Sequence, residues 1–258
     1  MAKITIRRPA AVLLATTTSL VLVSFAAPGT AATNGTLFVV QGLPRTTVDV
    51  SIDGDAVAQD VAGATLAGPF QVPAGSHVVT FTPEGEAPVE RTVELAAGES
   101  RDLVLHLPVQ AGGAALVTEF VNDLTGVPED KSALVVAHTA AVAPADILVN
   151  GDVLFENVAN GESLDLVVPG GTYEVQIVPT GQTTPVVLGP LDLTVEGGSL
   201  NRVFAVGDPA SDDMRVVVQV IDVADTGSGT PGRVETGSGG QAVGADAPPS
   251  VADLFRLP

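Results

Sequence analysis

The chain contains one short segment twice. The residues VDVSIDGDAVAQDV at 48–61 recur as ADILVNGDVLFENV at 145–158. Both segments alternate apolar and polar residues around a central turn signal. A duplication of this kind indicates that the chain is built from two copies of one small unit. Because the shared residues are apolar or typical of turns, the duplication predicts a scaffold and does not by itself predict a reaction.

Each copy carries a two-residue turn signal at the same place. Asp53-Gly54 in the first copy corresponds to Asn150-Gly151 in the second. These dipeptides tolerate the positive φ angles that a tight hairpin turn requires. We therefore predict one β-hairpin at each position, with a two-residue loop.

The rest of the chain is typical of an all-β protein. Short runs rich in Val, Leu, Ile and Thr are separated by Gly, Pro, Asp and Asn, and in 172–177 polar and apolar residues alternate. Alternation of this kind predicts strands with one buried face. We expect two tandem immunoglobulin-like antiparallel β-sandwich domains, at 33–124 and 131–223, joined by a short junction at 125–130. Such a junction favours contact or a fixed relation between the domains.

Both ends of the chain differ from its middle. Lys3, Arg7 and Arg8 precede an apolar stretch and then small residues, so 1–32 is predicted to be a secretory signal peptide. Residues 224–258 are rich in Gly, Ser, Thr and Pro, which predicts a flexible tail. We expect no membrane span after signal cleavage, and a secreted or cell-surface location, including the cell wall.

The charge and the lack of cysteine exclude several classes of function. Removing the three basic residues of the signal changes the formal net charge from −19 to −22. A chain this acidic is not expected to bind nucleic acid, because phosphate binding needs a cationic face. With no Cys residues, disulfides, thiol catalysis and thiolate metal sites are excluded.

Residues typical of enzyme active sites are present without the spacing that catalysis needs. An Asp-Thr-Gly-Ser sequence at 225–228 occurs once, whereas pepsin-like proteases use two carboxylates. Three histidines, His77, His106 and His138, occur without a Gly-x-Ser-x-Gly motif in the predicted domains. His77 corresponds to Tyr173 in the second copy, which favours packing on the face of a sheet. His138 corresponds to Gln41, which favours a hydrogen-bonding group at a strand end.

Oxygen ligands surround both predicted hairpins and are candidates for weak calcium binding. A hard cation prefers such ligands, but the chemistry of a hairpin turn explains the same residues without an ion. We therefore predict no catalytic or cofactor-binding residues, no cofactor and no established metal site. The calcium candidates are Asp49, Asp53, Asp55, Asp146, Asn150 and Asp152.

The two copies resemble a known family. The residues LVVAHTAAVAPADILVNGDVLFENVANGESLDLVVPGGTYEVQIVPTG and LDLTVEGGSLNRVFAVGD in the second copy are similar to the domain of unknown function 4397 family. VVQGLPRTTVDVSIDGDAV and GPFQVPAGSHVVTFTPEG in the first copy are also similar to it. This resemblance implies a β-sandwich in an exported surface protein, of a kind common in actinobacteria, and implies no catalytic residues.

The expected function is therefore non-enzymatic. We expect a structural, adhesion or protein-binding module of the cell envelope or extracellular space, whose partner is an unknown envelope or extracellular protein. The alternative is a binding module for a small extracellular ligand or carbohydrate. A hydrolase is the third candidate.

Overall fold

The computed structural model describes residues 34–110 and 112–223. The predicted signal peptide, the predicted tail and the Asp-Thr-Gly-Ser sequence lie outside these residues. Within them, no helix is long and apolar enough to cross a membrane. One short 3-10 helix, η1 (Pro209–Ser211), accompanies the strands.

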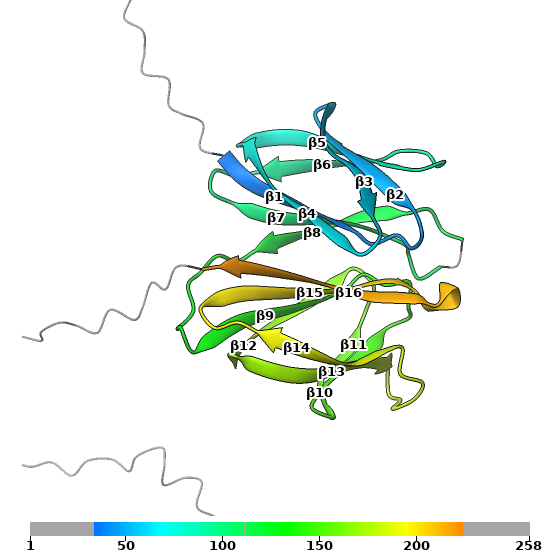
Figure 1. Cartoon of the computed structure of the whole chain (residues 1–258), viewed down its shortest axis with the longest axis vertical. Helices are drawn as coiled ribbons and strands as arrows, with labels where there is room; N and C mark the ends of the chain where they lie inside the picture. The colour runs from blue at the N-terminus through cyan, green and yellow to red at the C-terminus, as the bar shows by residue number, and fades with distance from the viewer. Residues whose placement is uncertain (1–33, 111, 224–258) are drawn as a thin grey trace, which may run out of the picture.

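The first copy forms a β-sandwich of two four-stranded sheets. The inner sheet has the order β4-β1-β7-β8 and the outer sheet the order β3-β2-β5-β6 (Figure 1). The strands are β1 (Asn34–Gln41), β2 (Thr47–Ile52), β3 (Asp55–Ala62), β4 (Thr65–Pro73), β5 (Gly75–Pro83), β6 (Val89–Leu95), β7 (Ser100–His106) and β8 (Leu116–Asn122).

The second copy repeats this arrangement. Its inner sheet has the order β12-β9-β15-β16 and its outer sheet the order β11-β10-β13-β14. The all-β sandwich architecture predicted from the sequence is confirmed in both copies. The strands are β9 (Lys131–His138), β10 (Ala145–Val149), β11 (Asp152–Val158), β12 (Glu162–Pro169), β13 (Gly171–Pro179), β14 (Leu188–Val195), β15 (Ser199–Asp208) and β16 (Asp213–Asp222).

Each inner sheet differs from the antiparallel expectation in one strand pair. β1 pairs with β7 in parallel, and β9 pairs with β15 in parallel. A parallel pair needs a long connection between its strands. Here the intervening strands of the same sandwich provide that connection, because the chain crosses to the outer sheet and back before β7 or β15 forms.

Both predicted hairpin turns are confirmed. Asp53 joins β2 to β3 with φ 52°, and Asn150 joins β10 to β11 with φ 52°. The glycines that follow have φ values of 89° and 86°. Positive φ at both turn positions defines the tight hairpin that the sequence predicts.

Each sandwich has its own apolar core between its two sheets. Phe81, Leu103 and Leu105 are fully buried in the first core. Ile147, Val203 and Ala205 are buried in the second. In the inner strands β7 and β15, the alternate residues point the other way, toward the opposite sandwich.

The two inner sheets face each other, so the four sheets form a stack of four layers (Figure 1). β16 lies against β4 at one side of this stack. The expected contact between the copies therefore exists, and it buries the outward faces of β7 and β15.

Candidate functional site: the interface between the sandwiches

An apolar cluster joins the inner sheets of the two copies. Val40 and Val104 come from adjacent strands of the first copy, and Ala137 and Phe204 come from the equivalent strands of the second. Val104, Ala137 and Phe204 have no exposed surface. Burial of this extent is typical of a core, so the copies share a hydrophobic interface.

A buried ion pair crosses this interface. Arg202 on β15 donates from Nη1 to Oδ2 of Asp102 on β7 at 2.7 Å, and from Nη2 to the backbone oxygen of Val121 at 2.8 Å. Oδ1 of Asp102 accepts from Nε2 of Gln219 at 2.8 Å and from Nδ2 of Asn122 at 3.0 Å. Both carboxylate oxygens of Asp102 therefore have donors.

Burial opposes the charge on both members of the pair. Asp102 is fully buried and Arg202 is 3 % exposed. Loss of water raises the pKa of Asp102, while Arg202 and the amide donors oppose that rise. Burial likewise lowers the pKa of Arg202, and Asp102 opposes this change. Attraction between the two charges therefore offsets the cost of removing them from water. Either charge alone would bear that desolvation cost without compensation.

The ion pair joins equivalent positions of the two copies. Gln41 and His138 end equivalent strands, and their parallel partners are Leu105 and Ala205. Asp102 precedes Leu105 by three residues, just as Arg202 precedes Ala205. The copies therefore meet through the same patch of surface, as the subunits of a two-fold symmetric dimer do.

The neighbours of the ion pair follow the same symmetry. Phe120 is the antiparallel partner of Asp102, and Gln219 is the partner of Arg202. Across the interface, Gln219 donates to Asp102, and the Arg202 guanidinium lies 5.6 Å from the centre of the Phe120 ring. The Phe120 and Phe204 rings are 6.2 Å apart. Each copy thus contributes one charge and one side chain that contacts the charge of the other copy.

Asn160 links the two copies near one end of the interface. Its Nδ2 donates to the backbone oxygens of Leu107 in the first copy and Ala140 in the second, at 3.3 and 2.6 Å. The Arg45 side chain, in the first copy, donates to the backbone oxygen of Ser211 in the second. Polar contacts therefore add to the ion pair at separate points of the interface.

Two buried histidines lie near the same interface. Nδ1 of His106 contacts the backbone oxygen of Leu107 at 3.0 Å, and Nε2 contacts Oγ1 of Thr118 at 2.8 Å. Burial lowers the pKa of His106, and the neighbouring His138 lowers it further. The stabilising contribution of the neutral ring is therefore complete above pH 6.5 and is lost as the pH falls through the lowered pKa.

His138 ends β9 and is 3 % exposed. Burial lowers its pKa, although the backbone at Ala143 and Val142 and the carboxylate of Glu162 favour protonation. Neither ring nitrogen has a partner with hydrogen-bond geometry among the described residues. The hydrogen-bonding role that the sequence predicts for His138 stays a prediction, since only the backbone at Ala143 and Val142 lies near its ring nitrogens. At the equivalent position, Nε2 of Gln41 donates to the backbone oxygen of Thr46.

His77 and Tyr173 perform the same structural task in the two copies. Nε2 of His77 lies 2.7 Å from the backbone oxygen of Pro73, and the Tyr173 hydroxyl donates to the backbone oxygen of Pro169 at 2.8 Å. His77 also contacts Oδ2 of Asp53 through Nδ1 at 2.7 Å. Since both ring nitrogens of His77 face acceptors, the protonated ring satisfies both contacts.

We expect His77 to make stability depend on pH near neutrality. The hydrogen bond that His77 donates to Asp53 raises the pKa of His77 above 6.5, and burial opposes the rise. Its stabilising contribution is therefore complete below pH 6.5 and is lost as the pH rises through the raised pKa. His77→Tyr, which copies the second sandwich, should remove this dependence. Urea unfolding of both proteins from pH 5.5 to 8.5 measures the difference, and parallel curves would contradict the assignment.

Four of the six calcium candidates accept hydrogen bonds from backbone N–H groups. Oδ1 of Asp53 accepts from Val78 N at 2.9 Å, and Oδ1 of Asn150 accepts from Glu174 N at 3.0 Å. Oδ1 of Asp49 accepts from Asp60 N at 2.9 Å. In this way the side chains hold the hairpins against the neighbouring strands and strand ends.

Asp146 makes the most extensive contacts of the six candidates. Its two oxygens accept from Asn157 N and Gly181 N, each at 2.8 Å, and the hydrogen bond from Asn157 is the main reason that its pKa is lowered. Asp55 and Asp152 are exposed at the starts of β3 and β11. Within 34–110 and 112–223, no group of three or more His, Cys, Asp or Glu side chains is arranged to hold a metal ion.

Asp146→Ala should destabilise the protein more than Asp49→Ala. The first substitution leaves two backbone N–H groups without acceptors and the second leaves one. We expect a loss of about 1–3 kcal/mol for Asp146→Ala. Thermal unfolding of both variants measures the difference, and it should be the same with millimolar calcium or with EDTA. A calcium-dependent rise in the melting temperature that Asp146→Ala abolishes would instead favour an ion site.

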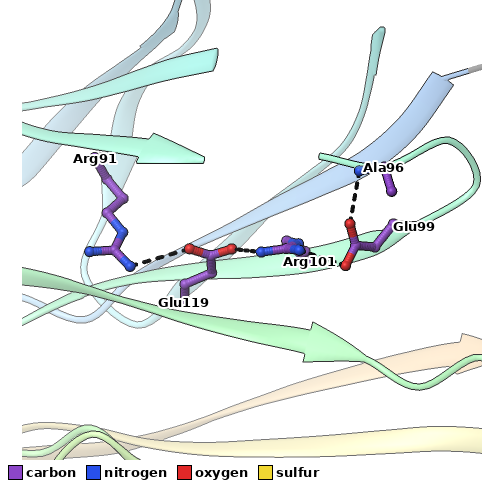
Figure 2. A network of polar contacts seen from close by, with 5 residues as sticks. All are labelled: Arg91, Ala96, Glu99, Arg101 and Glu119. Carbon is purple, nitrogen blue, oxygen red and sulfur yellow. Dashed lines mark hydrogen bonds and ion pairs between the residues drawn. The ribbon is translucent and has the colours of Figure 1, made fainter. Parts of the chain in front are cut away.

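An ion-pair network closes one edge of the first sandwich (Figure 2). Glu119 on β8 pairs with Arg91 on β6 at 3.3 Å and also with Arg101 on β7. Arg101 pairs in turn with Glu99 at 2.7 Å, and Glu99 accepts from Ala96 N at 2.8 Å. The hydrogen bond that Glu99 accepts from Arg101 lowers the pKa of Glu99. The network links the edge strands of the two sheets, so we assign it a structural role.

A pocket of about 470 Å³ opens beside the interface. Asp123 and residues 125–128 of the junction form one wall, and β9, β12 and β15 contribute the others. Arg202 reaches this pocket from the interface, and Asp123 and Asp165 add carboxylates to its lining. The pocket therefore combines an apolar surface with a small number of charges.

The described residues do not bring a histidine and a serine together as a hydrolase triad requires. The hydroxyl that contacts a histidine belongs to Thr118, and the histidine with a carboxylate partner is His77, in the outer sheet of the first sandwich. The acid, base and nucleophile of a triad must lie within hydrogen-bond reach of one another. No hydrogen bond between His and Ser side chains occurs within 34–110 and 112–223.

A family comparison identifies the first copy. Residues 35–145 match the family described as Domain of unknown function (DUF4397). The resemblance to the DUF4397 family is therefore confirmed over this part of the chain. The match ends at Ala145, the first residue of β10, so membership of the second copy stays a prediction. No curated protein matches the chain.

The residues that join the copies do not stand out in the sequence. Neither Asp102 nor Arg202 was a candidate, since neither lies in a recognisable motif. A signal existed: Leu103-Val104-Leu105 and Val203-Phe204-Ala205-Val206 are continuous apolar runs without alternation. Such runs indicate strands that are buried on both faces. A charged residue directly before each run is therefore a candidate for a buried ion pair.

Proposed function

We propose that this DUF4397 protein is an exported, non-enzymatic module that presents a surface for protein binding, adhesion or structure in the cell envelope or extracellular space. The observation that carries the proposal is that the buried polar side chains of the interface join the two sandwiches. Asp102, Arg202 and Gln219 hold two sandwiches in one orientation, rather than facing a reaction centre.

A fixed orientation suits a binding scaffold. Buried polar pairs can specify how two surfaces dock even when they add little net stability. Loops and edge strands of both sandwiches then form one continuous surface for a partner. The net charge of −19 favours a partner with a basic contact surface.

Fractionation and affinity capture test this proposal. The protein should be found in the culture medium or the wall fraction of its host, and immobilised protein should capture a specific envelope or extracellular protein. Arg202→Met, which disturbs the docking of the sandwiches, should weaken capture. Arg215→Met, whose side chain is 66 % exposed, is the matched control. Retention in the cytoplasm, or turnover of ester or glycoside substrates above the buffer rate, would contradict the proposal.

The pocket beside the interface favours a second candidate, a binding module for a small ligand. Its apolar lining and few charged groups are typical of ligand pockets. Carbohydrate is the less favoured ligand class, because sugars stack on aromatic rings and no aromatic residue lines this pocket. A ligand that binds only the folded protein would raise its melting temperature, so a thermal-shift panel tests this candidate.

A further inference from the structure

The two most exposed large apolar side chains that the structure describes line the pocket beside the interface. Val167 on β12 is 58 % exposed and Val121 on β8 is 53 % exposed, the two largest values among the large apolar residues that the structure describes. Both line the same pocket. Exposed apolar surface at a concave site is typical of a docking surface.

The strands beside this pocket are sheet edges. β8 is the last strand of the first inner sheet, and β12 is the last strand of the second. On the other side of the stack, the edge strands β4 and β16 lie against each other. The symmetry of the interface is therefore broken at β8 and β12, where the pocket lies between the two copies.

The described chain ends beside this pocket. Val223 follows β16 and is 6 % exposed. It packs in one cluster with Val127, Val135 and Leu200, and these three residues also line the pocket. The described part of the chain therefore ends at the pocket wall.

We propose that residues 251–258, VADLFRLP, dock in this pocket of their own chain. The segment combines Leu254, Phe255 and Leu257 with one cation, Arg256. The apolar side chains match the exposed Val121 and Val167. The cation matches Asp123 and Asp165 in the pocket lining, where Arg202 is already paired with Asp102.

The connection is long enough and favours docking. The 27 residues at 224–250 lie between Val223 and this segment and include many Gly and Ser. A chain of that length and composition has a root-mean-square reach of about 29 Å. Tethering at that distance gives an effective concentration on the order of millimolar. Even a segment with weak intrinsic affinity would then occupy a neighbouring pocket for much of the time.

Engineered cysteines in the full chain without its signal peptide test this proposal. The natural chain has no cysteine, so an introduced pair reports only on itself. Ser163→Cys places one thiol in the pocket lining. Asp253→Cys places the other in residues 251–258 and leaves the apolar residues of that segment unchanged. The control pairs Asp253→Cys with Ser76→Cys, an exposed position on β5 in the outer sheet of the first sandwich.

Disulfide formation in a glutathione buffer measures the effective concentration of each pair. We expect a value at least about tenfold higher for the pocket pair than for the control pair. Adding Phe255→Asp should reduce the effective concentration of the pocket pair to that of the control pair. Equal values for the two pairs would overturn the proposal. Disulfides between chains instead of within one chain would also overturn it and would identify a second copy as the occupant. Capture of an envelope or extracellular protein is a separate measurement, so the disulfide results do not decide the proposed function.

Discussion

Arg202→Met should destabilise the protein by about 3–5 kcal/mol, because it leaves Asp102 buried without its counter-ion. Asp102 has no exposed surface, and two amide donors cannot replace the removed cation. Unfolding in urea should show the loss as a lower midpoint. The contact between the sandwiches should weaken most, so a single transition should broaden or divide into two.

A double-mutant cycle separates the ion pair from the packing around it. Asp102→Asn alone leaves the Arg202 charge buried and should cost about as much as Arg202→Met. The combined variant removes both charges, so its loss should be clearly smaller than the sum of the two single losses. Arg215→Met, which removes an exposed pairing with Asp213, should change stability by less than about 0.5 kcal/mol. Additive losses in the cycle would contradict a coupled pair.

Phe204→Ala should destabilise the protein by about 3–5 kcal/mol. The Phe204 ring is fully buried between the inner sheets and lies 6.2 Å from the Phe120 ring. Its removal leaves a cavity between the two inner sheets. The other interface side chains keep these sheets apart, so the sheets cannot move together to close the cavity. Calorimetry should show the loss, and the two sandwiches should unfold more independently than in the natural protein.

Phe155→Ala is the matched control for this substitution. It removes the same atoms from a partly buried position at the edge of the second core, away from the interface. A smaller loss is expected, without any change in the coupling between the two sandwiches. If both alanine variants lost equal stability and unfolded with equal cooperativity, the interface would not have the energetic role that its burial implies.

The local elements of this fold could be predicted from the sequence because local chemistry determines them. Asp53-Gly54 and Asn150-Gly151 favour positive φ angles, and the hairpins form there. The alternation of His77, Val79 and Phe81 with exposed or half-buried neighbours along β5 gives one buried face, as the sequence indicated. Duplication of these signals also predicted that the second copy would repeat the fold of the first.

The task of individual polar residues was harder to predict. The acids around the hairpins were equally consistent with a calcium site and with a turn. In the structure, Asp49 and Asp146 accept from backbone N–H groups of the neighbouring strand. The position of those N–H groups depends on strand register and on bulges in the β2–β3 and β10–β11 pairs, which no local pattern specifies.

The sequence by itself determined that this protein consists of two similar all-β units, with hairpins at defined places and an acidic composition. Only the tertiary structure decided how the units meet. Strand periodicity records whether a face is buried, but not what covers it. Asp102 and Arg202 are one hundred positions apart in sequence, and their pairing requires the inner sheets to be stacked in one orientation. That choice depends on the shape and charge of two complete surfaces, which exist only after both copies have folded.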